Sequence, residues 1–453
     1  AVDYVTMELT NQRQKVSLSL LKKDAETRKP LEGVVFGLYA QEDIKNAVGE
    51  VVVEKDALIE LGTTDEEGKL VFQADLPHGK YYIQEVEHKP GYLPNDEVYS
   101  FDASYTDQTL ELLAFSEEIS NQPTITEFTK VDLTGGQEIE GAKMQILDQE
   151  GKVVEEWVSK KEAHVVYALA PGEYILHEEQ APTEQGYVRA EDVKFVVEET
   201  GDVQKVKMED DHTKVSISKT DITDGKEIEG AKLQVLDQDG EVVESWTTGE
   251  EHLIEYIPVG TYTLHEEAAI DGYIVANDVE FTVEETGEIQ KVKMEDERAM
   301  GQLVIVKTDA DSKAALEGVE FVLLEKETGE EVGRLKTGKD GKAVSELLPI
   351  GTYENGVFKE PITYVLKETA TLKGYEKTEE EWEIVFTYQN DKTPVIEVVK
   401  EIQNKKIPET PGTVKPGPKT GDDTNWFLPL LALGVSAGMV AGLLYYRKRH
   451  KKA

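Results

Sequence analysis

Four lysines and four glutamates occupy matching places in this sequence, and their types and spacing could support amide-bond chemistry. Each lysine opens a Lys-x-Asp motif and is followed by a Gly eleven residues later. The copies are Lys22/Asp24/Gly33, Lys130/Asp132/Gly141, Lys219/Asp221/Gly230 and Lys307/Asp309/Gly318. Each glutamate closes a Tyr-x-Ile/Leu-x-Glu motif. These copies are Tyr81/Ile83/Glu85, Tyr174/Leu176/Glu178, Tyr262/Leu264/Glu266 and Tyr364/Leu366/Glu368. The recurrence predicts one amine and one carboxylic acid in each of four repeated units.

The alternation of side chains along a β strand places these groups among apolar neighbours. Residues two apart share a face, so each Glu lies on the face of a Tyr and an aliphatic residue. Three of the lysines follow two aliphatic residues on their own face, as Lys22 follows Leu18 and Leu20. Lys130 has weaker support, with Phe128 before it. The pattern predicts that lysine and glutamate both point into the core of each unit.

An amide or acid partner is found at the end of each unit. The last strand finishes in an Asn or Asp two residues after an apolar one. These pairs are Ile119 and Asn121, Met208 and Asp210, Met294 and Asp296, and Ile402 and Asn404. Acidic residues flank both Asp210 and Asp296, but parity favours these two because they share a face with Met208 and Met294.

Burial of these three groups would change their chemistry. Isolated buried charges are costly, so such groups must be neutral, paired or covalently bonded. Burial lowers the pKa of a lysine and raises that of a glutamic acid. A neutral amine could then attack the Asn or Asp carbonyl, while the glutamic acid donates a hydrogen bond to it and moves protons. The product would be a Lys–Asn or Lys–Asp isopeptide bond, with loss of ammonia or water.

Two other interpretations fit the same residues. Each Lys and Glu could be a surface charge at a strand end, although four matching units disfavour this. Alternatively, a unit could hold a buried salt bridge without covalent closure. The second unit, with its weaker lysine strand, is the best candidate for a salt bridge.

The elements around these residues predict an all-β chain of several domains. A length of 453 residues exceeds what one core usually supports. Units of about 90–110 residues with short alternating strands and regular turns are typical of antiparallel β-sandwiches. The two middle units are near copies, since DVKFVVEETGDVQKVKMED recurs as DVEFTVEETGEIQKVKMED. The outer two carry insertions.

The three motifs together resemble Cna B-type domains, the prealbumin-like modules of Gram-positive pilins and adhesins, including SpaA-type pilins. The resemblance covers about residues 14–406 and implies a self-generated isopeptide bond in each domain. Carried over, the triads of lysine, proton-shuttling glutamate and acceptor are Lys22–Glu85–Asn121, Lys130–Glu178–Asp210, Lys219–Glu266–Asp296 and Lys307–Glu368–Asn404. The implied domains are 14–122, 123–212, 213–298 and 299–406. Residues 1–13, with Asn11, are expected to be the end strand of a truncated upstream domain.

The C-terminal region predicts an anchor. Trp426–Tyr446 is free of charge and long enough to span a bilayer, and the basic tail 447–453 predicts a cytoplasmic end. The Pro- and Gly-rich spacer 407–425 contains Gly417-Pro418-Lys419-Thr420-Gly421. The arrangement resembles the LPxTG-type cell-wall sorting signal, in which sortase cuts between Thr and Gly and joins the protein to peptidoglycan. Here the cut would fall between Thr420 and Gly421. Gly417 replaces the usual Leu, so a plain membrane anchor is the alternative.

Composition excludes several functions. With 91 acidic against 49 basic residues and a net charge of -42, the chain should repel nucleic acid. The absence of cysteine excludes disulfides and thiol chemistry. We expect no cofactor and no metal. His177 and His265 should face outward, and Asp221-x-x-Asp224-Gly225 lacks the alternating ligands of a calcium loop, which favours a solvated turn.

These observations predict an extracellular, wall-anchored stalk or accessory pilin rather than an enzyme with turnover. Pilin subunits or host ligands are its possible partners. The main alternative is an adhesin that binds host matrix or glycan through one domain. The Tyr-Pro-Lys motif that resembles the polymerising lysine site of shaft pilins is absent, which disfavours a shaft subunit.

Overall fold

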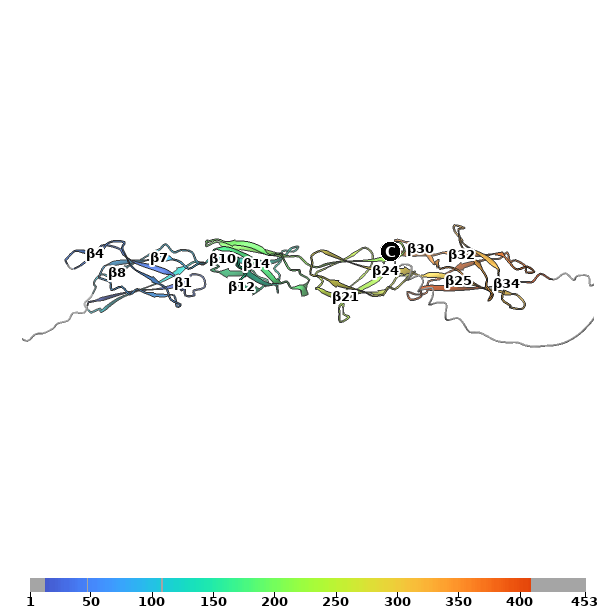
Figure 1. The fold of residues 1–453 in the computed structure, drawn as a ribbon, viewed down its shortest axis with the longest axis horizontal. Coiled ribbons are helices and arrows are strands. Elements are labelled where there is room, and N and C mark those ends of the chain that lie inside the picture. Colours follow the sequence, from blue (N-terminus) through green and yellow to red (C-terminus); the bar gives the residue numbers. More distant parts are fainter. Residues whose placement is uncertain (1–12, 47, 107–108, 409–453) are drawn as a thin grey trace, which may run out of the picture.

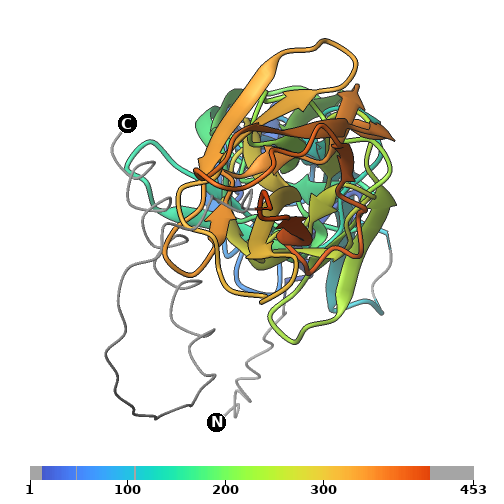
Figure 2. The ribbon, with the colours of Figure 1, turned by 90° about the vertical axis from the view of Figure 1, so that its right-hand side faces the viewer.

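A computed structural model describes residues 13–46, 48–106 and 109–408 and shows four β modules joined end to end in a rod (Figure 1). Figure 2, viewed along the long axis, shows the modules one behind another. Each module is a sandwich of two sheets, so the all-β prediction is confirmed. In the described residues the sole helical element is one 3-10 turn, η1 (Thr183–Gln185).

Module 1 packs a three-stranded sheet, in the order β6-β1-β9, against a four-stranded sheet, in the order β5-β2-β7-β8. A separate hairpin, β3–β4, extends from it. The strands are β1 (Lys15–Asp24), β2 (Val35–Ala40), β3 (Ile44–Lys45), β4 (Val51–Val53), β5 (Leu58–Thr63), β6 (Lys69–Val71), β7 (Lys80–Glu87), β8 (Val98–Asp102) and β9 (Leu112–Asn121).

Modules 2 and 3 repeat this plan without the hairpin. In module 2 the sheets run β13-β10-β16 and β12-β11-β14-β15, and in module 3 they run β20-β17-β24-β22 and β19-β18-β21-β23. The strands of module 2 are β10 (Ile125–Asp132), β11 (Lys143–Leu147), β12 (Val153–Val158), β13 (His164–Tyr167), β14 (Gly172–Gln180), β15 (Val193–Val197) and β16 (Val203–Asp210). Those of module 3 are β17 (Lys214–Asp221), β18 (Lys232–Leu236), β19 (Val242–Thr247), β20 (His252–Glu255), β21 (Gly260–Ala268), β22 (Tyr273–Ile274), β23 (Val279–Val283) and β24 (Ile289–Arg298).

Module 4 again carries an insertion, the hairpin β30–β31. Its sheets contain β28, β25, β29 and β34 on one side and β27-β26-β32-β33 on the other. The strands are β25 (Met300–Asp309), β26 (Glu320–Glu325), β27 (Glu331–Lys336), β28 (Lys342–Val344), β29 (Leu348–Pro349), β30 (Gly351–Glu354), β31 (Val357–Pro361), β32 (Thr363–Ala370), β33 (Glu381–Val385) and β34 (Val395–Asn404).

One strand pair in each module departs from the expected antiparallel arrangement. The first and last strands run parallel: β1 with β9, β10 with β16, β17 with β24, and β25 with β34. All other strand pairs recorded for the described residues are antiparallel. Parallel neighbours need a crossover connection, and here the rest of the module provides it. The pairing brings the two ends of each module's sequence into one sheet.

Each module has its own apolar core between its sheets. The core of module 1 includes Leu18, Leu20 and Ile83, which supports the parity predicted for β1 and β7. The β10 strand of module 2 is equally buried, because Thr124 and Thr126 lie on the same inward face as Phe128. The weak apolar pattern before Lys130 therefore reflects threonines at a module junction, not an exposed strand.

Within the described residues, no helix is long and apolar enough to cross a membrane. The predicted span Trp426–Tyr446, the motif Gly417–Gly421 and the expected strand around Asn11 lie outside the described residues.

Candidate functional site

The parallel pair of strands places each lysine next to its predicted acceptor. In module 1, Lys22 on β1 is level with Ile119 on β9, and Asn121 follows two residues later on the same face. The other modules share this register, with Lys130 level with Met208, Lys219 with Met294 and Lys307 with Ile402. A lysine side chain that extends along the strand direction reaches the acceptor on the neighbouring strand.

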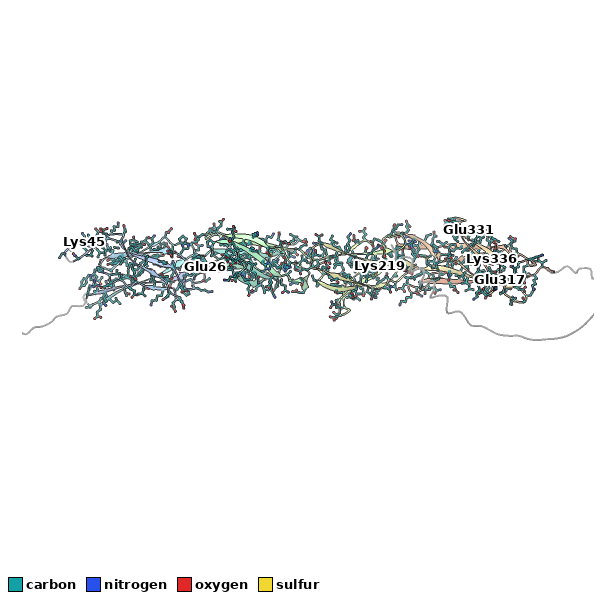
Figure 3. All side chains as sticks on the ribbon, in the orientation of Figure 1. Glu26, Lys45, Lys219, Glu317, Glu331 and Lys336 are labelled. Carbon is teal, nitrogen blue, oxygen red and sulfur yellow. The ribbon has the colours of Figure 1, made fainter. Side chains whose placement is uncertain are left out.

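The glutamate comes from the opposite sheet. Glu85 lies on β7 and is level with Phe36 on β2, so it approaches Lys22 across the core. Glu178, Glu266 and Glu368 take the same place, level with Met144, Leu233 and Phe321. The structure therefore brings together all three predicted residues in each of the four modules. Figure 3 shows Lys219 within module 3.

Modules 1 and 4, with Asn acceptors, have closely similar geometry. Lys22 Nζ donates to Asn121 Oδ1 at 2.5 Å and lies 2.8 Å from Glu85 Oε2. Asn121 Nδ2 donates to both Glu85 oxygens, at 2.9 and 3.0 Å. In module 4, Lys307 Nζ donates to Asn404 Oδ1 at 2.5 Å and to Glu368 Oε2 at 2.8 Å. Asn404 Nδ2 donates to Glu368 Oε1 at 2.7 Å.

Modules 2 and 3 have Asp acceptors in the same place. Lys130 Nζ contacts Asp210 Oδ1 and lies 2.9 Å from Glu178 Oε2. Lys219 Nζ contacts Asp296 Oδ1 and lies 2.8 Å from Glu266 Oε2. The second oxygen of each carboxyl group is buried without a hydrogen-bond partner. These atoms are Glu178 Oε1, Asp210 Oδ2, Glu266 Oε1 and Asp296 Oδ2. Two ionised carboxylates would leave these oxygens unsatisfied, whereas a proton held between the two groups satisfies both.

The sites are dry, and burial shifts their protonation. All four lysines and all four acceptors are at most 3% exposed. Burial lowers the pKa of Lys22 and of Lys307, against the opposing effects of Glu85 and Glu368. Burial also raises the pKa of Asp210 and of Asp296 to about 7, and the neighbouring glutamates contribute to both shifts. A lysine with a lowered pKa is more often the neutral, nucleophilic amine. The carbonyl carbon of a protonated Asp is a better electrophile than that of its carboxylate.

The sequence family of the chain follows from a comparison with known domain families. The SpaA prealbumin-like fold domain matches four consecutive segments, 16–115, 124–212, 213–298 and 301–402. These segments cover most of the chain. The chain belongs to this family.

Among solved structures, the chain is similar to the Bacillus anthracis TIE protein and to two pilins. The Bacillus anthracis TIE protein is 22% identical over 83% of this chain and 69% of its own, with a TM-score of 0.44. A streptococcal ancillary pilin is 16% identical over 63% of this chain and 99% of its own, with a TM-score of 0.26. BcpA, the major pilin subunit of Bacillus cereus, is 16% identical over 63% and 100%, with a TM-score of 0.27. No curated protein matches the chain.

A further arrangement that recurs in the four SpaA-type modules was not predicted from the sequence. The Asp of each Lys-x-Asp motif is at most 2% exposed and is level with the acceptor in the parallel pair, as Asp24 is with Asn121. Its carboxylate accepts backbone N–H groups of the following turn and a tyrosine hydroxyl, which in module 1 is Tyr92 at 2.9 Å. The recurring signal was a Gly-Tyr pair after each glutamate strand: Gly91-Tyr92, Gly186-Tyr187, Gly272-Tyr273 and Gly374-Tyr375.

The structure also corrects the interpretation of Asp221-x-x-Asp224-Gly225 as a solvated turn. Asp221 is fully buried and accepts hydrogen bonds from Tyr273 at 2.7 Å and Arg298 at 2.6 Å. Arg298 also donates to Asp224 at 3.1 Å. The guanidinium group of Arg298 therefore pairs with both carboxylates. Outside this turn, His177 and His265 lie on the surface beside Asp192 and Asp278. No metal-binding cluster occurs among residues 13–46, 48–106 and 109–408.

Proposed function

We propose that the chain is a wall-anchored surface stalk whose modules each form an isopeptide bond between lysine and acceptor. The observation that carries the proposal is the fourfold recurrence of a buried Lys–Glu–Asn/Asp cluster, with the lysine nitrogen in contact with the acceptor oxygen. A surface salt bridge is incompatible with this burial. A buried ion pair without covalent closure remains the alternative that the experiment below must exclude.

In modules 1 and 4 the bond forms with loss of ammonia. The neutral Lys22 amine attacks Cγ of Asn121, and the amine loses one proton to Glu85. Glu85 already accepts hydrogen bonds from Asn121 Nδ2, so it returns the proton to the departing nitrogen. The C–N bond to Lys22 forms, the C–N bond to the amide nitrogen breaks, and ammonia leaves.

In modules 2 and 3 the leaving group is water. The reaction needs a neutral amine and a protonated acceptor, and the raised pKa of Asp210 and of Asp296 favours the protonated form. Lys130 attacks Cγ of Asp210, and Glu178 transfers the amine proton to the departing hydroxyl group. Exclusion of water from the core favours the amide over its hydrolysis.

Such a bond would suit a stalk because it joins the first and last strands of a module. Each bond closes a loop of almost the whole module, since Lys22 and Asn121 are 99 positions apart and Lys219 and Asp296 are 77 apart. Closing a loop of this length restricts the unfolded chain, as a disulfide does. It also prevents the terminal strands from being peeled away under tension.

The intact mass of the purified protein tests the proposal. We expect a deficit of two ammonias and two waters relative to the sequence. Replacing Glu85, Glu178, Glu266 and Glu368 with Ala one at a time should restore one leaving group each. A mass equal to that of the unmodified sequence would exclude the bonds and leave buried ion pairs in their place.

Anchoring is a separate part of the proposal and is supported by the sequence of residues 407–453. Sortase would cleave between Thr420 and Gly421, and the Thr420 carboxyl group would be joined to peptidoglycan. We expect the Thr420→Ala protein to stay in the membrane fraction of a Gram-positive host, while the parent chain is released by a peptidoglycan hydrolase. Equal release of both proteins would favour the plain membrane anchor.

One observation favours a second candidate function, adhesion. Module 1 exposes five apolar side chains on the β3–β4 hairpin and on the strand β5 that follows it, each at least 45% exposed: Val48, Val51, Val52, Leu58 and Leu61. The hairpin lies at the end of the rod farthest from module 4, where Figure 3 labels Lys45. Contiguous exposed apolar surface often marks an interaction site. Replacing Val51 and Val52 with Thr should weaken binding to immobilised matrix protein, whereas Val154→Thr on module 2 should not.

A further inference from the structure

The junction between modules 2 and 3 contains a contact that crosses from one module into the other. Tyr256 follows β20 of module 3, and its hydroxyl group donates to Asp132 Oδ2 of module 2 at 2.9 Å. Asp132 is fully buried and is the partner of the acceptor Asp210 in the parallel ladder. Module 3 thus supplies a hydrogen-bond donor to a buried carboxylate beside the cross-linking site of module 2.

The backbone at this junction fits closely. Tyr256 has a positive φ of 59°, an uncommon conformation for a tyrosine, and it packs on Gly186 of module 2. A Cβ atom on Gly186 would lie 2.3 Å from the Tyr256 backbone. Thr213 connects the two: its N–H donates to Gly186 O at 2.8 Å, and its carbonyl accepts the Tyr256 N–H at 3.1 Å. Such strain persists only where the surroundings hold it in place.

Aromatic stacking holds the Tyr256 ring in position. The ring stacks on His212 at a centroid distance of 3.9 Å and meets the Tyr187 ring edge-on at 5.6 Å. Burial and the hydrogen bond to Asp132 raise the pKa of Tyr256 to about 12, so its hydroxyl keeps the proton that it donates. Burial opposes ionisation of Asp132, but hydrogen bonds from the Gly135 N–H and the Tyr256 hydroxyl group lower its pKa.

The corresponding contacts in the other modules are internal. Asp24 accepts a hydrogen bond from Tyr92 of its own module. Asp221 accepts hydrogen bonds from Tyr273 and Arg298, and Asp309 accepts one from Tyr375. At the junction of modules 1 and 2, Ala168 takes the place of Tyr256 and has no hydroxyl group. At the junction of modules 3 and 4, Tyr353 donates to the Gly272 carbonyl instead. Module 2 has the internal contact as well, from Tyr187 to Asp132, and among the described residues it is the module whose aspartate also accepts a hydrogen bond from a tyrosine of the next module.

We propose that Tyr256 is a positioning residue for the cross-link of module 2, so that the Lys130–Asp210 bond forms efficiently only when module 3 is docked. The inference rests on the proposed isopeptide chemistry. Tyr256 acts through Asp132: it satisfies that carboxylate and holds the end of β10 in register with Asp210. Without the Tyr256 hydroxyl group, Asp132 keeps the hydrogen bond from Tyr187 of its own module but loses the one that fixes the end of β10 against module 3.

The rate of bond formation in the full chain tests this inference. The chain is made by cell-free synthesis, samples are quenched in acid at intervals, and peptide mass mapping follows all four cross-links. We expect Tyr256→Phe to slow the Lys130–Asp210 bond about tenfold and to leave the other three unchanged. Tyr262→Phe is the control, because its hydroxyl group contacts Pro258 O within module 3. An unchanged rate at Lys130–Asp210, or an equal slowing of several modules, would overturn the inference.

A second pair of variants tests docking itself. Gly186→Ala should separate the modules and slow the same bond. Gly151→Ala is matched, since both glycines have φ of 79°, but a Cβ at Gly151 meets nothing within 4 Å. Equal effects of the two variants would show that backbone strain alone is responsible, against the inference. If the parent chain itself lacks the Lys130–Asp210 bond, the proposed isopeptide chemistry is wrong for module 2. If only the variants lack an effect, the role proposed for Tyr256 is wrong.

Discussion

Lys22 Nζ donates to Asn121 Oδ1 at 2.5 Å, although the two residues are 99 positions apart in the sequence. Both lie in the dry interior of module 1, and Glu85 contacts both. The relationship recurs in the other three modules, between Lys130 and Asp210, Lys219 and Asp296, and Lys307 and Asn404.

Each glutamate should act on its own module alone. Glu85→Gln should abolish the Lys22–Asn121 bond, because an amide cannot accept the amine proton and return it to the leaving nitrogen. The other three bonds should form normally, since each module has a separate core. Peptide mass mapping checks this. Glu87→Gln, an exposed change on the same strand, is the control, and the idea is wrong if the bond survives in the Glu85 variant.

Loss of an acceptor should destabilise its module. In Asn121→Ala the loop closed by the bond opens, and a restriction worth about 4–5 kcal/mol on the unfolded chain disappears. Chemical denaturation should show one module unfolding well before the others. Ser116→Ala, at an exposed position on β9, should leave the unfolding profile unchanged. Equal stability of the Asn121 variant and the parent would mean that the bond is absent or contributes nothing.

The pH dependence of bond formation should differ between the two kinds of module. In modules 2 and 3 the acceptor must be protonated, and the pKa of Asp210 and of Asp296 is about 7. Above pH 7 the protonated fraction falls about tenfold for each pH unit. Modules 1 and 4 have no acceptor carboxyl group. Time courses at pH 6, 7, 8 and 9 should therefore show the ratio of Asp-module to Asn-module rates falling above pH 7. A constant ratio would contradict the proposed role of a protonated Asp.

Exchange of the acceptor should exchange the leaving group. Asp210→Asn should still form a bond to Lys130, because Asn121 and Asn404 occupy the same register position in their modules. The loss from module 2 should change from water to ammonia, and the decline in rate above pH 7 should vanish for that module. Intact mass and time courses check both. Failure of the Asn variant to react would show that modules 2 and 3 are specialised for Asp.

The inward orientation of the reactive residues could be predicted from the sequence because it depends only on neighbouring residues of the same strand. Alternation along a strand decides which side chains share a face, so Leu18, Leu20 and Lys22 had to point the same way. Four copies removed most of the ambiguity that a single lysine would leave. The all-β fold followed from the same periodicity, whereas the SpaA-type resemblance rested on the three recurring motifs.

Tertiary structure decided what lies across the core and across the junctions. Strand parity cannot tell a parallel from an antiparallel neighbour, so the pairing of β1 with β9, which aligns Asp24 with Asn121, was not predictable. The contact of Tyr256 with Asp132 joins residues 124 positions apart in different modules. No local pattern encodes it, because it depends on how one folded module packs against the next.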